Sequence, residues 1–166
     1  MKLKSKLSAV IVACFVSAAV QWPAFAHEAK CPHCELDVVQ NTATQDNEVA
    51  LKYGKKRIEY RCVMCAIADG NKSYKGDLTI LAPTEIKGKP VEIVRKDGKW
   101  AGPEGMVVLG QQVKHRNCQT GYRVFTSKAA FDAHVQKNKV ILKDAQPITL
   151  VQLVEIADQE NAGDTK

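Results

Sequence analysis

Residues 48–65, EVALKYGKKRIEYRCVMC, decide the fold, because they predict a hairpin that leads directly into a helix. Glu48–Lys52 and Arg57–Tyr60 have the composition of strands, and Tyr53-Gly54-Lys55 between them has that of a turn. A short helix is expected over Cys62–Asp69 or somewhat beyond. This stretch therefore predicts two strands followed by a helix.

A third strand completes this unit, and a linker follows it. The segment after the helix has a turn at Lys75-Gly76 and an apolar run over Leu78–Leu81, which predicts a strand. We therefore assign residues 27–82 to a first ββαβ module. Residues 83–90 contain two prolines and a glycine and are expected to form a linker.

The same order of elements recurs in residues 91–145, and a C-terminal helix follows. The elements predicted in this second ββαβ module are a hairpin over Val91–Trp100 around Asp97-Gly98, strands over Met106–Leu109 and Gly121–Phe125, a helix over Ser127–Asn138 and a strand over Val140–Leu142. Thr149–Gln152 fits a capping box, so residues 146–158 are assigned to a helix and 159–166 to a tail. The expected fold is α+β, with two tandem ββαβ modules that share a small core, and a C-terminal helix.

Four cysteines in two Cys-x-x-Cys pairs are the main candidates for chemistry. The pair Cys31 and Cys34 is separated by 27 residues from the pair Cys62 and Cys65. Because the hairpin between them returns the chain to its starting edge, the two pairs are expected to converge. Four thiolates suit zinc, and two or three of them, with Met64, suit Cu(I). Each pair can instead oxidise to a disulfide.

The repeat also predicts where the second pair lies on its helix. Alignment of Ile58–Cys62 with Arg123–Ser127 places Cys62 at the N-cap and Cys65 at the third helical position. Unpaired N–H groups at a helix N-terminus stabilise a thiolate. Cys62 and Cys65 are therefore predicted to be metal ligands or nucleophiles of low pKa, the alternative being that they are small buried apolar residues.

A further pair, His115 and Cys118, precedes the strand at Gly121–Phe125. A histidine and a cysteine at this spacing can complete the main metal site or form a second one. The alternative is a surface histidine and an unmodified cysteine on a loop.

The N-terminus has the pattern of a secretory signal over residues 1–26. Lys2, Lys4 and Lys6 precede an apolar stretch over Leu7–Val20, and Ala24-Phe25-Ala26 fits a cleavage site. The apolar run falls short of the roughly 20 residues that span a bilayer. We therefore expect a periplasmic protein without a stable membrane span after cleavage. A lipoprotein form cleaved at Cys14 is the alternative.

Charge and motifs limit the class of function. Removal of residues 1–26 lowers the formal net charge from +6 to +3, because 21 basic and 18 acidic residues remain. This excess is too small to indicate nucleic-acid binding. Five cysteines also remain, an odd number that does not fit a pure disulfide framework. The chain has no recognisable Gly-rich phosphate loop, HExxH motif or Ser-His-Asp arrangement, so neither a conventional hydrolase nor a nucleotide enzyme is predicted.

Several motifs resemble the NosL family of nitrous oxide reductase accessory proteins. The matching segments are Lys89–Ile93, Trp100, Met106–Gly110, Tyr122–Ser127 and Ala129–Asn138. The resemblance covers residues 31–145. It implies tandem ββαβ modules and a role in handling Cu(I) outside the cytoplasm, with nitrous oxide reductase as one of several possible clients.

The chain departs from the family pattern at its candidate ligands. The family's Cys-x-x-Cys-Gly-Met appears as residues 31–36, CPHCEL, so the glycine and the methionine are missing. A Met-Gly element is replaced by residues 115–118, HRNC, and a second Cys-x-x-Cys containing Met64 is present. This chain is therefore richer in cysteine and histidine than the family pattern.

Three functions follow as hypotheses. The first is a non-enzymatic periplasmic protein that binds a soft metal, most readily Cu(I), and passes it through partly exposed thiolates to a client metalloprotein or assembly partner. The second is an interaction or scaffold module stabilised by a structural four-cysteine zinc site. The third is a thiol–disulfide oxidoreductase that acts through Cys62 and Cys65.

Overall fold

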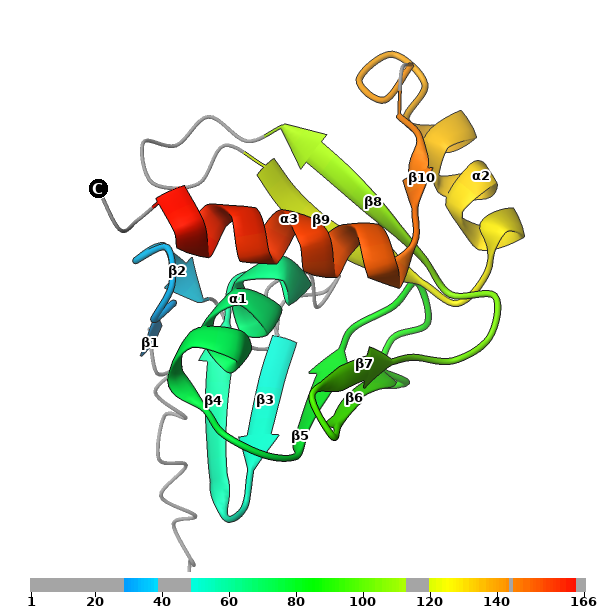
Figure 1. Cartoon of the computed structure of the whole chain (residues 1–166). Coiled ribbons are helices and arrows are strands. Elements are labelled where there is room, and N and C mark those ends of the chain that lie inside the picture. The colour runs from blue at the N-terminus through cyan, green and yellow to red at the C-terminus, as the bar shows by residue number, and fades with distance from the viewer. Residues whose placement is uncertain (1–28, 39–48, 113–119, 144, 164–166) are drawn as a thin grey trace, which may run out of the picture.

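A computed structural model describes residues 29–38, 49–112, 120–143 and 145–163 (Figure 1). The elements of these residues, in chain order, are β1 (Ala29–Lys30), β2 (Asp37–Val38), β3 (Val49–Tyr53), β4 (Lys56–Tyr60), α1 (Val63–Ser73), β5 (Leu78–Ala82), β6 (Val91–Lys96), β7 (Lys99–Ala101), β8 (Val107–Gln112), β9 (Thr120–Phe125), α2 (Lys128–Lys137), β10 (Pro147–Ile148) and α3 (Leu150–Gly163). The predicted α+β class is confirmed.

The first ββαβ module has the predicted order of elements. β3 and β4 pair antiparallel, and Gly54 supplies the positive φ of +57° that their tight turn requires. β5 pairs antiparallel with the other edge of β3, so β3 lies at the centre of the module. Alternate residues of β5 are buried, as expected for a strand with one face on the core.

The second module repeats this topology over β8, β9, α2 and β10. β8 lies between β9 and β10 and pairs antiparallel with both, as β3 does with β4 and β5. In both modules the first strand is therefore central, and the strand after the helix adds to its free edge. The tandem repeat predicted from the sequence is present in the strand order.

Two predicted elements of the second module lie elsewhere. The hairpin at Val91–Trp100 forms β6 and β7, which extend the first sheet, because Ala82 of β5 pairs with Val91 of β6 across the predicted linker. The strand predicted at 140–142 is instead a turn, and β10 takes its place beside β8. Leu142 is buried there while its two preceding neighbours are exposed, a pattern that a turn can satisfy.

One main core joins the two modules and the C-terminal helix. Its buried members include Tyr60, Ile67 and Ile80 from the first module and Val108 and Val124 from the second, together with Leu153 of α3. A smaller cluster lies under α2 and consists of Leu109, Phe125, Phe131 and Leu142. The modules are therefore not independent domains, which agrees with the predicted shared core.

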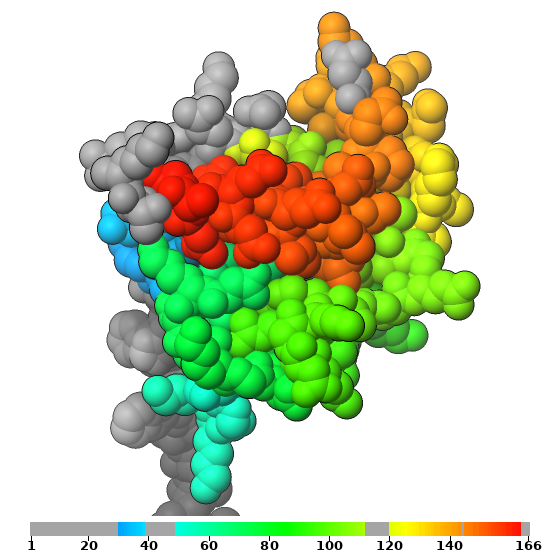
Figure 2. All heavy atoms as spheres, viewed as in Figure 1, coloured from blue at the N-terminus to red at the C-terminus, as the bar shows by residue number. Residues whose placement is uncertain are grey.

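The C-terminal helix α3 lies along α1, and Figure 2 shows the two in contact on one face of the molecule. The predicted capping box is present, since the Thr149 N–H donates to Gln152 Oε1 at 2.8 Å and the Gln152 N–H donates to Thr149 Oγ1 at 3.3 Å. The prediction of a helix over 146–158 needs correction, because α3 begins at Leu150 and continues to Gly163. Asn161 Nδ2 donates to the Ala68 carbonyl of α1 at 2.8 Å, which holds the last turn in place.

The cap of α2 gives a first prediction. Ser127 Oγ accepts a hydrogen bond from the Ala130 N–H at 3.2 Å, so Ser127→Ala leaves that N–H without its partner. We expect the free energy of unfolding to fall by about 1 kcal/mol in a urea titration. Ser127→Thr, which keeps the hydroxyl, is the control and is expected to lose less. Equal stability of the alanine variant and the unsubstituted protein would show that the cap contributes nothing.

Among the described residues, no helix has both the length and the apolar character needed to cross a membrane. The predicted signal segment, residues 1–26, lies outside the described part of the chain. So do His115 and Cys118.

Candidate metal centre

The first cysteine pair lies on a small hairpin formed by β1 and β2. Ala29 pairs with Val38 and Lys30 with Asp37, and an ion pair also joins the side chains of Lys30 and Asp37. The turn between these strands is closed by a hydrogen bond from the Cys31 N–H to the Leu36 carbonyl at 2.8 Å. This tight turn brings the two cysteines of the pair close together. We refer to residues 29–38 as the cysteine hairpin.

Glu35 has a backbone conformation that favours glycine. Its φ is +61°, in the left-handed region, and its N–H donates to the Cys31 carbonyl at 2.8 Å to shape the turn. Glycine adopts this region without steric cost, whereas other residues do not. Glu35 therefore occupies a turn position that a glycine would fill without steric cost.

The second cysteine pair lies at the start of α1. Cys62 is the N-cap, with φ −151° and ψ 169°, and Cys65 is the third helical residue. This confirms the N-cap position that the repeat predicted for Cys62. Its thiol makes no capping hydrogen bond, in contrast to the Ser127 hydroxyl at the matching position of α2. The Cys62 sulfur can therefore turn toward another partner without loss of a helix cap.

Three of the four cysteines form a compact group. The sulfur atoms of Cys31, Cys34 and Cys65 all lie within 4.8 Å of one another. Cys62 is not a member of this group, but its sulfur lies 3.5 Å from that of Cys65. The structure therefore brings both predicted pairs together, with Cys65 next to every other thiol and Cys62 at the margin.

Hydrogen bonding favours a negative charge in this group. Hydrogen bonds from the Cys34 and Cys65 thiols lower the pKa of the Cys31 thiol to about 2, the backbone N–H groups of Arg61 and Cys34 act in the same direction, and burial opposes them. The group therefore favours loss of a proton from one of its thiols. A buried anion shared by two S–H donors can be neutralised by a bound cation, which replaces the protons of the donors.

The cysteines are buried thiols and not disulfides. Their side chains are at most 4% exposed, and no disulfide joins the four cysteines that the structure describes. The Cys62–Cys65 sulfur distance of 3.5 Å is a hydrogen-bond distance, well above the roughly 2.05 Å of a disulfide bond. The prediction of partly exposed ligands is therefore wrong for the described residues, because the cysteine hairpin covers the start of α1.

Of the remaining predicted ligands, Met64 lies in the described part of the chain. Met64 belongs to the main core, where it is buried with its apolar neighbours. His115 and Cys118 lie outside the described residues. The Arg61 backbone N–H, which donates to Cys31, was not predicted, because a main-chain donor leaves no mark on the residue types of a sequence.

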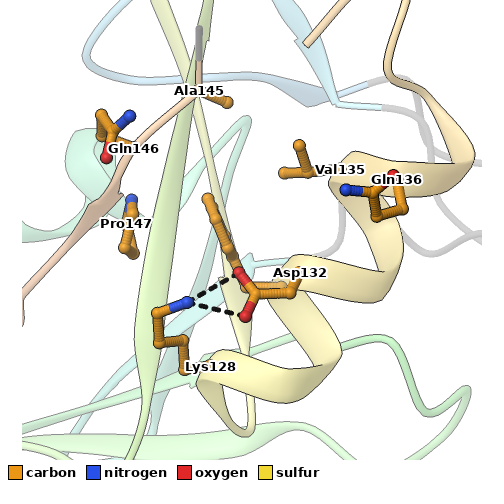
Figure 3. A pocket seen from close by; sticks show the side chains of 8 residues that line it. Lys128, Asp132, Val135, Gln136, Ala145, Gln146 and Pro147 are labelled. Atoms are coloured by element: carbon orange, nitrogen blue, oxygen red, sulfur yellow. Dashed lines mark hydrogen bonds and ion pairs between the residues drawn. The ribbon is translucent and has the colours of Figure 1, made fainter. Parts of the chain in front are cut away.

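A separate hollow lies between α2 and β10 and contains no cysteine (Figure 3). Its lining residues are Lys128, Phe131, Asp132, Val135, Gln136, Ala145, Gln146 and Pro147. Lys128 Nζ is 2.6 Å from the nearer carboxylate oxygen of Asp132, so the two charges in the hollow neutralise each other. This hollow lacks the soft ligands of the cysteine group.

Comparison with known proteins finds a solved structure of similar fold but no matching family. No family model and no curated protein matches this chain. Among solved structures, the chain is similar to one described as "Crystal structure of the mercury-bound form of MerB2", with a TM-score of 0.56 and 14% sequence identity. The match covers 69% of this chain and 57% of that chain, so the similarity spans just over half of MerB2. At this identity the likeness shows a shared fold, within which this chain has a group of three cysteines able to hold a metal ion.

Proposed function

We propose that this protein binds a soft metal ion, Cu(I) in particular, through the thiolates of Cys31, Cys34 and Cys65. The mutual approach of these three sulfur atoms within 4.8 Å is the observation that carries the proposal. Three thiolates without a fourth equivalent ligand suit the low coordination number of Cu(I), whereas structural zinc is almost always four-coordinate. The protein acts here as a binding protein and not as an enzyme.

Two observations support Cu(I) handling of the NosL type. The segments that resemble that family lie in residues 89–138, and the tandem ββαβ topology is the one that the resemblance implies. The structure of MerB2 is of a mercury-bound form, and mercury is also a soft, thiophilic metal. We therefore propose an accessory protein for the assembly of a metalloprotein, acting in the periplasm after removal of residues 1–26.

The division of ligands between two elements supports a route for metal transfer. Cys31 and Cys34 are on the cysteine hairpin, whose paired strands are only two residues long, whereas Cys65 is on the well-packed helix α1. The paired strands of this hairpin are the shortest of the first module, so we expect its local opening to be the step that releases the metal from Cys31 and Cys34. During opening, Cys62 can replace the departing ligands, since its sulfur is 3.5 Å from that of Cys65. A client's ligands then enter at the vacated positions.

A structural zinc site is the second candidate. The four cysteines are buried, and a modest rotation of the Cys62 side chain toward the group would complete a four-thiolate site. A site of that kind would stabilise the fold, and its metal would exchange slowly. The two candidates differ in the number of thiolate ligands and in the consequence of metal removal.

Metal removal distinguishes these functions. We expect protein isolated without oxygen to bind one equivalent of Cu(I), and a competing chelator to remove it without loss of circular dichroism. Zinc that resists mild chelation, with unfolding once it is removed, would favour the scaffold. Absence of metal with both pairs oxidised would contradict both candidates and favour the oxidoreductase.

A further inference from the structure

The turn between α2 and β10 carries two adjacent apolar side chains that the fold leaves in water. Val140 is 86% exposed and Ile141 is 75% exposed, the highest values among the large hydrophobic residues of the described chain. Figure 2 shows this segment (orange) projecting from the body of the molecule. Single exposed hydrophobic residues are ordinary, but two neighbours at the apex of a projection are not explained by the packing of the core. We refer to residues 139–143 as the apolar tip.

The structure holds the apolar tip in place at both ends. The Asn138 carbonyl accepts hydrogen bonds from the N–H groups of Ile141 at 2.9 Å and Leu142 at 3.0 Å, and Asn138 Nδ2 donates to the His134 carbonyl at 2.8 Å. Leu142 is buried in the small cluster with Phe125 and Phe131. The exposure of Val140 and Ile141 is therefore a property of a fixed, hydrogen-bonded turn.

Positive charges surround the two apolar side chains. Lys137, Lys139 and Lys143 are all exposed. The only acidic residue of the sequence 137–144 is Asp144, so the segment has a formal charge of +2 (three lysines minus one aspartate). Apolar side chains flanked by lysines suit the surface of an anionic bilayer, where the apolar groups enter the boundary between headgroups and acyl chains and the ammonium groups meet lipid phosphates.

We propose that the apolar tip binds the surface of an anionic lipid bilayer, with Val140 and Ile141 inserted and Lys139 and Lys143 contacting headgroups. A convex apex of two side chains offers far less apolar area than a stable protein–protein interface needs, which favours a lipid surface over a protein partner. The cysteine hairpin (β1 and β2) lies away from the apolar tip in Figure 1, so the proposed membrane contact does not involve it. This proposal does not depend on which metal is bound.

Vesicle binding tests the proposal. We expect the processed protein to bind phosphatidylcholine vesicles that contain phosphatidylglycerol, and to bind pure phosphatidylcholine vesicles much more weakly. Val140→Ser/Ile141→Ser should weaken binding about tenfold or more, because the inserted methyl groups are lost. Val151→Ser is the matched control, since Val151 is 67% exposed on α3, and its effect should stay within about twofold. Equal effects of the tip and control substitutions would overturn the proposal, as would a failure of the unsubstituted protein to bind at low salt.

A charge series and a local measurement complete the test. Lys139→Gln/Lys143→Gln should weaken binding and flatten its dependence on salt. Lys55→Gln/Lys56→Gln, at the end of the β3–β4 turn and the start of β4, should not. Hydrogen–deuterium exchange of residues 138–143 should slow with anionic vesicles. Because this measurement is local, vesicle binding by the apolar segment in residues 1–26 would not produce the same result. Unchanged exchange at the tip, with protection elsewhere, would assign membrane binding to another part of the chain and overturn the proposal.

Discussion

Cys65→Ser is expected to lower the affinity for Cu(I) by roughly 100-fold or more, the largest effect of any single substitution in this protein. Cys65 is the ligand that the two cysteine pairs share, because its sulfur lies within 4.8 Å of those of Cys31 and Cys34 and 3.5 Å from that of Cys62. Serine keeps the size of the side chain but replaces a soft thiolate by a hard, protonated hydroxyl. The two thiolates that remain in the group both lie on the short cysteine hairpin.

Competition with a coloured Cu(I) chelator of known affinity measures this loss. Cys62→Ser is the matched control: it is also a buried cysteine of the same pair, yet its sulfur lies outside the compact group. We expect it to change the affinity by no more than about tenfold while slowing metal transfer to the chelator. Circular dichroism verifies that both variants are folded.

The outcomes separate the two candidate sites. Equal, large losses for Cys62→Ser and Cys65→Ser would indicate four equivalent thiolates and favour structural zinc. An unchanged affinity of Cys65→Ser would contradict the metal centre itself. A loss confined to Cys65→Ser would support the three-thiolate centre.

Arg95→Met is expected to give the largest loss of stability, about 3 kcal/mol in the free energy of unfolding. The Arg95 guanidinium is buried and donates to the carbonyls of Gly70 at 2.7 Å, Tyr74 at 2.8 Å and Gly76 at 2.9 Å. These are the carbonyls at and beyond the C-terminal turn of α1, which otherwise have no helical N–H partner. Methionine fills part of the space but leaves the buried bond position at the Gly70 carbonyl without this donor, and it also removes the part-buried bonds to Tyr74 and Gly76.

Urea unfolding measures the effect, and the neighbouring exposed Lys96→Met serves as its control. The control should stay within about 0.5 kcal/mol of the unsubstituted protein, because it removes no buried hydrogen bond. Arg95 also lies 5.5 Å from the centre of the Trp100 ring, and Trp100 fluorescence therefore reports local loosening. A loss of stability as small as that of Lys96→Met would show that water satisfies these carbonyls.

The two predictions are linked through α1. Its start carries Cys62 and Cys65, whereas Arg95 of β6 fixes its last turn. The hairpin Val91–Trp100 thus supports the C-terminal end of α1 from the first sheet, although the sequence assigned it to the second module. Since the helix start is held by the main core, we expect folded Arg95→Met protein to keep its metal affinity.

The sequence by itself determined the local elements and the repeat. The hairpin of residues 49–60, the N-cap at Cys62 and the capping box at Thr149 were all predicted correctly, because each depends on residue types within a few positions of one another. The convergence of the two cysteine pairs was also predicted, since a hairpin must return the chain to its starting edge.

Only the tertiary structure decided how these parts combine. The hairpin of β6 and β7 can pair with any free sheet edge. It pairs with the edge of β5, the strand that precedes it in the chain. Two further features have the same kind of cause: the Cys62 sulfur lies outside the compact group, and a turn replaces a strand at 140–142. They depend on packing between residues far apart in the chain, which local periodicity does not encode.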